Sequence, residues 1–90
     1  MAATKQEIVS WFKRGVTKGA THMIVVCDTF DWNDYPVFAK TLTEAHVQVT
    51  AHNGPNMQRV MEVYDLHADM DEQLAEHRAW RLPPEPADVR

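Results

Sequence analysis

Carboxylates are the most concentrated reactive groups in this sequence, and they gather in one short segment. The oxygen-bearing side chains there are Asp28, Asp31, Asn33 and Asp34. Closely spaced oxygen ligands are what Ca²⁺ or Mg²⁺ requires. The spacing fails for an EF-hand, because counting from Asp31 places Tyr35 at a ligand position, Pro36 at the glycine position and Leu42 at the twelfth position. Asp and Asn also cap turns by accepting hydrogen bonds from nearby backbone N–H groups. We therefore predict a capped turn, with no metal and no other cofactor.

A second candidate for chemistry is Cys27, the only cysteine, which excludes an intrachain disulfide and a Cys-rich zinc site. A nucleophilic thiol needs a neighbouring base, and the sequence offers His22, His46, His52, His67 and His77. Cys27 nevertheless lies in an apolar segment, where a cysteine usually behaves as a small buried hydrophobe. Strand alternation also puts it on the face opposite His22 and Asp28. We predict no catalytic role for this thiol.

Other catalytic patterns are weak. The spacing of the histidines suits no shared metal ion, and the three glycines form neither a P-loop nor a dinucleotide fingerprint. Asp28, Glu62 and Asp65 could supply paired carboxylates for acid–base work, although nothing in their spacing requires it. The sequence therefore predicts no catalytic residue and leaves open whether the chain is an enzyme.

Large aromatic side chains crowd the acidic segment, and they are its most distinctive feature. Aromatic residues on a polar loop often anchor interfaces, because they bury much area at little entropic cost. Alternatively, the loop folds back and buries them in the core of the protein. On the first interpretation, the predicted partner surface consists of Phe30, Asp31, Trp32, Asp34 and Tyr35.

The length, charge and cysteine content of the chain limit the classes of function that we expect. Ninety residues fit one small domain, expected over residues 1–82, followed by a Pro-rich mobile tail at 83–90. The net charge is −4 and the nine basic residues are scattered, so we expect no direct nucleic-acid binding. An unpaired cysteine and the lack of a long apolar run or signal-like start predict a cytoplasmic protein without a membrane segment. A homodimer would be one way to cover leftover apolar surface.

The elements expected to position these residues form an α+β fold, in which a small antiparallel sheet of three strands packs against helices. We expect strands at about 21–30, 35–40 and 57–66, and helices at about 4–18, 43–52 and 70–81. The apolar middle of the first strand predicts a central strand covered on both faces, and the turn after it predicts a hairpin. Segment 43–52 is ambiguous: its capping pattern favours a helix, whereas Val47, Val49 and Ala51 alternate as in a strand.

Four blocks of the sequence carry a resemblance. They are Gly19–Asp31, Asp34–Phe38, Asn56–Leu66 and Glu72–Trp80. With these blocks the chain resembles a small uncharacterised family of bacteria and their phages, over about residues 9–80. The resemblance implies a small accessory protein, and it implies no activity and no catalytic residue.

The leading hypothesis is a non-enzymatic protein-binding module that inhibits or adapts a bacterial protein, such as a host protein or a defence complex. The alternative is a small hydrolase or metal-dependent enzyme that uses the Asp28, Asp31 and Asp34 loop, or Cys27 with a histidine. A third hypothesis is an acidic mimic of DNA, which would bind a basic DNA-handling protein.

Overall fold

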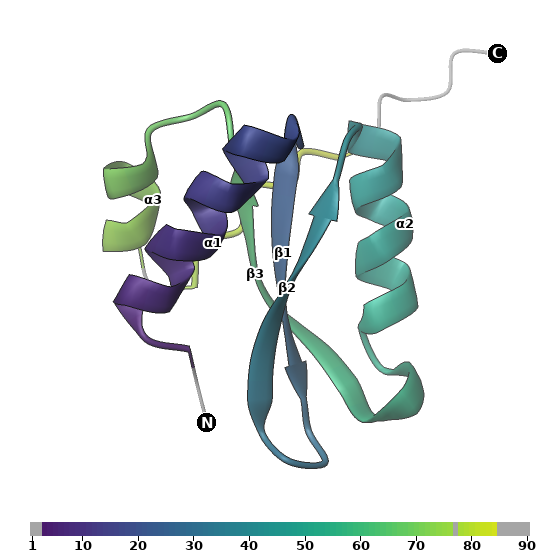
Figure 1. The fold of residues 1–90 in the computed structure, drawn as a ribbon. Coiled ribbons are helices and arrows are strands. Elements are labelled where there is room, and N and C mark those ends of the chain that lie inside the picture. The colour runs from purple at the N-terminus through teal and green to yellow at the C-terminus, as the bar shows by residue number, and fades with distance from the viewer. Residues whose placement is uncertain (1–2, 77, 85–90) are drawn as a thin grey trace, which may run out of the picture.

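The computed structural model describes residues 3–76 and 78–84 (Figure 1). The element order is α1 (Lys5–Lys18), β1 (His22–Asp28), β2 (Asn33–Ala39), α2 (Leu42–His52), the 3₁₀ turn η1 (Pro55–Met57), β3 (Gln58–Asp65) and α3 (Met70–Ala75). Three helices and a three-stranded antiparallel sheet make this an α+β fold, as predicted.

Helix α1 begins and ends where its sequence predicts. Thr4 and Glu7 form a reciprocal capping box, with the Glu7 N–H 3.1 Å from Thr4 Oγ1 and the Thr4 N–H 3.0 Å from Glu7 Oε1. Gly19 follows the helix at φ 78°, a left-handed conformation that glycine adopts without a Cβ penalty. Ile8 and Phe12 are buried, so the side of the helix that carries them faces the sheet.

Strand β1 is the centre of the sheet. The strand order is β2-β1-β3, and β1 pairs antiparallel with both neighbours. Met23 to Val26 are fully buried because both faces of β1 are covered. The predicted central strand and hairpin are therefore confirmed, although β1 ends at Asp28, two residues earlier than expected.

The two faces of the sheet carry separate apolar clusters. Met23 and Val25 pack with α1, and α3 packs against the same cluster, whereas Ile24 and Val26 pack with α2 on the other face. Figure 1 shows α1 and α3 on one side of the strands and α2 on the other. The sheet is thus the middle layer of the described structure.

A β-bulge in β3 adapts this strand to both layers. Val25 and Val26 pair with Glu62 and Val60, which leaves Met61 as an extra residue on β3. Without the bulge, Val60 and Val63 would lie on opposite faces, because side chains alternate along a strand. With it, both belong to the cluster that packs against α2.

The segment 43–52 is helical, since α2 covers Leu42–His52 and the Thr41 side chain accepts a hydrogen bond from the Glu44 N–H at 3.0 Å. Ala45 and Val49 pack against the sheet, while Val47 is 58% exposed. The alternation of Val47, Val49 and Ala51 is therefore no strand signal here: helical geometry separates these residues around the helix axis.

The predicted helix over 70–81 is too long, because α3 ends at Ala75. Ala79 is only 1% exposed, and its carbonyl accepts from the Val63 N–H at 2.9 Å, while the Arg81 N–H donates to the Val63 carbonyl at 2.8 Å. These bonds flank a parallel bridge between Val63 and Trp80. Pairing with the free edge of β3 thus overrides the local helix pattern, as tertiary contacts often do.

Two further expectations for this end of the chain concern His77 and the Pro-rich tail. His77, expected on the face of the last helix, lies outside the described residues, as does most of the expected tail at 83–90. Among the described residues, no helix is both long enough and apolar enough to cross a membrane.

Candidate functional site

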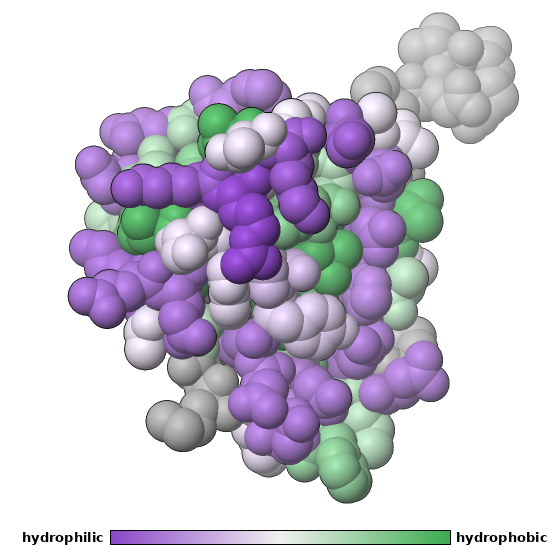
Figure 2. Space-filling model, viewed as in Figure 1, coloured by the Kyte–Doolittle hydropathy of each residue, from purple (hydrophilic) through white to green (hydrophobic). Residues whose placement is uncertain are grey.

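The turn between β1 and β2 holds the most exposed aromatic side chains of the described structure. Phe30 is 77% exposed and Trp32 is 63% exposed. In Figure 2, apolar surface lies at the lower end of the molecule, where Figure 1 places this turn. Two exposed aromatic residues on one turn are a candidate contact surface, because each can bury about 150–250 Å² when covered.

Asp28 holds this turn in shape. Its Oδ1 accepts from the Phe30 N–H at 2.9 Å, and its carbonyl accepts from the Trp32 N–H at 2.7 Å. Trp32 adopts φ 60°, a left-handed conformation that is uncommon for a bulky residue. The two aromatic side chains are therefore displayed by a hydrogen-bonded turn.

A second loop joins the first through Thr29. Both its N–H and its hydroxyl donate to the Met57 carbonyl, each at 2.7 Å. Met57 is 55% exposed. We call Phe30, Trp32 and Met57 the apolar tip. Met57 lies outside the surface predicted from the sequence, and its local signal is the Gly-Pro-Asn turn before it.

Tyr35 does not join the apolar tip. Its hydroxyl accepts a hydrogen bond from Gln58 Nε2, and its ring meets the His52 ring edge-on with centroids 6.4 Å apart. It also packs against the cluster beneath α2, and burial, followed by the charge of Asp28, raises its pKa. Within the predicted surface, the Tyr35 side chain is thus tied to the core.

Asp31 and Asp34 occupy different settings. Asp31 is exposed, and its Oδ1 accepts from the Asn33 N–H at 3.3 Å. Asp34 is half-buried, and its Oδ2 accepts from the Ala3 N–H at 2.9 Å, which ties the start of the chain to β2. Asp31 therefore adds negative charge to the exposed turn, whereas Asp34 also has a structural role.

The carboxylates of the candidate cation loop do not come together at one site. Asp28 pairs across the hairpin with Asn33, and Asp34 pairs with Cys27, so the side chains of Asp28 and Asp34 leave opposite faces of the sheet. Each of the three carboxylates accepts a hydrogen bond from a backbone N–H. Within residues 3–76 and 78–84, no group of three or more His, Cys, Asp or Glu side chains could hold a metal ion.

Cys27 is poorly suited to nucleophilic attack. It is 6% exposed, and its pKa is raised by burial and by a hydrogen bond to the Asp34 carboxylate. A raised pKa keeps the group as the thiol, whereas the thiolate is the reactive form. The side chain thus behaves as a buried apolar residue with one polar neighbour.

The remaining candidates are dispersed. Asp28 pairs with Gln58 and His22 pairs with Asp65, so Asp28 and Asp65 lie at opposite ends of β1, about 20 Å apart. A shared acid–base role for these two carboxylates is excluded by that distance.

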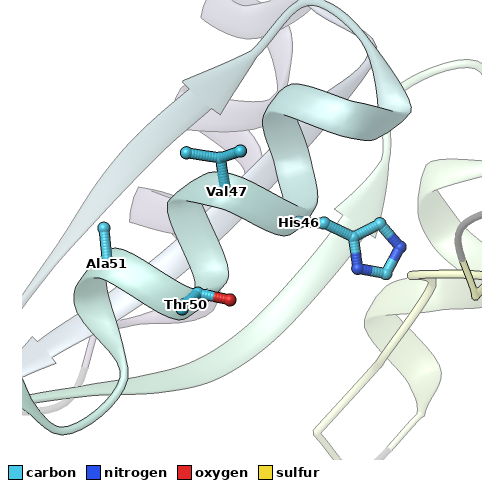
Figure 3. A pocket seen from close by; sticks show the side chains of 4 residues that line it. All are labelled: His46, Val47, Thr50 and Ala51. Atoms are coloured by element: carbon cyan, nitrogen blue, oxygen red, sulfur yellow. The ribbon is translucent and has the colours of Figure 1, made fainter.

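A shallow hollow of about 430 Å³ lies on the outer face of α2. Figure 3 shows its lining side chains, which are His46, Val47, Thr50 and Ala51. The His46 imidazole turns toward the C-terminal segment, where Nε2 lies 2.8 Å from the Pro83 carbonyl oxygen. Among the described lining residues, the polar side chains are His46 and Thr50, and the His46 ring hydrogen-bonds to the Pro83 carbonyl.

Comparisons with models of protein families, with curated proteins and with solved structures found no match. The resemblance to a family of bacteria and phages stays a prediction, and function must be argued from the geometry of the chain.

Proposed function

We propose that this protein is a non-enzymatic protein-binding module whose contact surface is the turn carrying Phe30 and Trp32. The observation that carries the proposal is the display of two large aromatic side chains, 77% and 63% exposed, on a turn fixed by hydrogen bonds to Asp28. Rigid aromatic anchors give much of the binding energy at protein interfaces, because little conformational entropy is lost when they are covered.

The sheet edges favour contact through side chains over strand addition. Pro36 lies on the edge strand β2 and has no N–H to offer a further strand. On the other side, the Trp80 segment already pairs with β3 at Val63. Pro36 and the Trp80 segment both hinder the addition of a further strand at the sheet edges. A partner is therefore expected to contact the end of the hairpin.

The proposed setting is the bacterial cytoplasm, where the protein would inhibit or adapt a bacterial protein, such as a host protein or a defence complex. This part of the proposal rests on the family resemblance and on the unpaired, buried Cys27, which suits a reducing compartment.

The test is capture of a partner from a bacterial lysate with the tagged protein and with a Phe30→Ala, Trp32→Ala variant. The matched control is a Val16→Ala, Val47→Ala variant, which truncates two exposed apolar residues far from the turn, 52% and 58% exposed. We expect the control to retain the partner and the turn variant to bind at least about tenfold more weakly. Tyr35 is left intact because its truncation would remove contacts within the core.

Three outcomes would contradict the proposal. Equal capture by both variants would remove the turn as the contact surface. A tightly bound divalent ion in native mass spectrometry would favour the metal-dependent enzyme. A partner that handles DNA, released steeply by salt whether or not the aromatic residues are present, would favour the DNA mimic.

A further inference from the structure

The apolar tip is built from two loops, and left-handed backbone is concentrated there. Trp32, Asn56 and Met57 have φ of 60°, 55° and 60°, and they are three of the four non-glycine residues with positive φ in the described chain. Such conformations are costly for L-residues and persist where the surrounding structure imposes them. The shared bonds of Thr29 to the Met57 carbonyl impose one common geometry on both loops.

The charge around the apolar tip has one dominant sign. Asp28, Asp31 and Asp34 all lie in the first loop or at its borders, and neither 28–35 nor 53–58 contains a Lys or Arg. The nearest basic residue along β3 is Arg59, which pairs with Cys27 beside the tip. Asp28 and Asp31 therefore add negative charge beside the exposed apolar side chains, whereas Asp34 leaves the opposite face from Asp28 and accepts from the Ala3 N–H.

We propose that Met57 belongs to the same contact surface as Phe30 and Trp32, an inference that rests on the proposed function. This surface fits an apolar protein pocket with a basic rim. Three side chains from two loops fill a pocket, and the carboxylates meet Lys or Arg at its rim. A second copy of this chain is disfavoured as the occupant, because tip-to-tip contact would bring together the Asp28 and Asp31 carboxylates of both copies. Methionine suits an anchor position because its flexible thioether adapts to irregular apolar surfaces.

The probe is an amphipathic helical peptide of leucine and lysine, which presents an apolar face bordered by positive charge. It is added to the full ¹⁵N-labelled protein, and the amide resonances are followed by NMR. We expect shifts in residues 29–33 and also in 56–58. A leucine–glutamate peptide of the same pattern is the matched control, and it should shift neither loop.

A Met57→Ala variant tests whether the Met57 side chain itself contributes to binding. We expect it to raise the Kd for the leucine–lysine peptide about fivefold, while Val16→Ala leaves the Kd unchanged. Shifts confined to 29–33, or an unchanged Kd for Met57→Ala, would overturn the two-loop surface. Equal shifts with both peptides, or none with either, would overturn the basic rim.

These results are distinguishable from a failure of the proposed function. A lysate partner that is lost with Phe30→Ala, Trp32→Ala and kept with Met57→Ala leaves the binding module standing and removes only Met57 from its surface. Self-association that is lost with Phe30→Ala would identify a second copy as the occupant and would overturn the heterologous pocket.

Discussion

The two ends of the sheet differ in which side chains are exposed and which are buried. At the apolar tip, large apolar side chains are exposed to solvent. At the other end, where β1 begins and β3 ends, polar side chains are buried: His22 is 8% exposed and Gln73 is 1% exposed. We call this second region the polar end and define it by His22, Asp65 and Gln73.

The buried polar groups at the polar end are satisfied by neighbours. Gln73 Oε1 accepts from the Asp65 N–H at 2.8 Å, and Gln73 Nε2 donates to the carbonyls of Asp65 and Asp69 at 2.9 and 3.1 Å. Among the described residues, no buried side-chain nitrogen or oxygen lacks a partner. A buried polar group is tolerated only when its hydrogen bonds are made, so this arrangement serves the fold.

We expect the polar end to stabilise the fold and the apolar tip to bind a partner. Satisfied polar groups at the polar end lock α3 onto the end of β3, and their loss is expected to weaken the whole structure. Exposed apolar groups at the tip contribute less to folding than buried ones, because more than half of each residue's surface stays in water in the free protein. Mutations at the two ends should therefore change different measured quantities.

The largest expected effect comes from Gln73→Met, which keeps the length of the side chain and removes its hydrogen bonds. The Asp65 N–H would lose its partner, whereas the two carbonyls keep backbone partners, the Ala68 N–H at 3.2 Å and the Gln73 N–H at 3.3 Å. We therefore expect a loss of about 1–3 kcal/mol in the free energy of unfolding. Urea denaturation of both proteins measures the difference. Gln6→Met, at an exposed position of α1, is the matched control and should stay within about 0.5 kcal/mol of the wild type.

If Gln73→Met is as stable as its control, the polar end is not the stabilising region and the comparison fails. A large loss that is accompanied by unchanged binding at the tip would sharpen the comparison.

A smaller effect is expected from pH, through His22. Burial lowers the pKa of its imidazole below 6.5; the Asp65 charge opposes this shift, while His67 and His46 add to it. The unfolded chain therefore takes up the proton first, and stability should be complete above about pH 6.5 and fall as the pH drops below it. One such proton changes the free energy of unfolding by at most about 1.4 kcal/mol per pH unit.

The measurement is urea denaturation across pH 5 to 7 for the wild type and for His22→Asn, whose amide can replace the bond between Nδ1 and Thr21 Oγ1, 2.9 Å apart. This range reaches about 1.5 units below and about 0.5 unit above the pKa of an unperturbed histidine. The variant should show a flatter profile. Parallel profiles would mean that His22 is not the group that links stability to pH at this end.

Local patterns predict most of the fold, because most elements have local causes. The Thr4 and Glu7 spacing and the apolar run in β1 predict α1 and the central strand without reference to the rest of the chain. The end of α3 could not be predicted this way, because it is decided by pairing between Val63 and Trp80, which are distant in sequence. The bulge at Met61 has the same origin, since it is defined by the pairing of β3 with β1.

In the candidate site, too, some features have local causes and others depend on contacts between distant segments. Residue types in the first loop predict an acidic turn with aromatic side chains, but they do not distinguish Phe30 from Tyr35. That distinction comes from β2, which places Tyr35 opposite Val26 on the face covered by α2. Met57 joins the tip through hydrogen bonds to Thr29, a contact between segments far apart in the chain that no local pattern indicates.

The smallest expected effect tests whether the tip is rigid. Thr29→Val keeps the shape of the side chain and removes one of the two hydrogen bonds to the Met57 carbonyl, while the backbone N–H keeps the other. Because this site is near the surface and the carbonyl keeps a partner, we expect a loss of only about 0.5–1 kcal/mol in the free energy of unfolding. The larger change should be local: amide hydrogen exchange at Thr29 and Met57 should accelerate, while exchange in the middle of β1 changes little.

The matched control is Thr17→Val, which removes a hydroxyl that donates to the Lys13 carbonyl at 3.0 Å within α1. It should leave exchange at the tip unchanged, because α1 lies outside the two loops. Faster exchange at the tip, together with weaker binding of the leucine–lysine peptide by Thr29→Val, would tie recognition to the shared geometry of the loops. Unchanged exchange would mean that the loops hold their positions independently, and Met57 would then depend on the backbone of its own loop for its place at the tip.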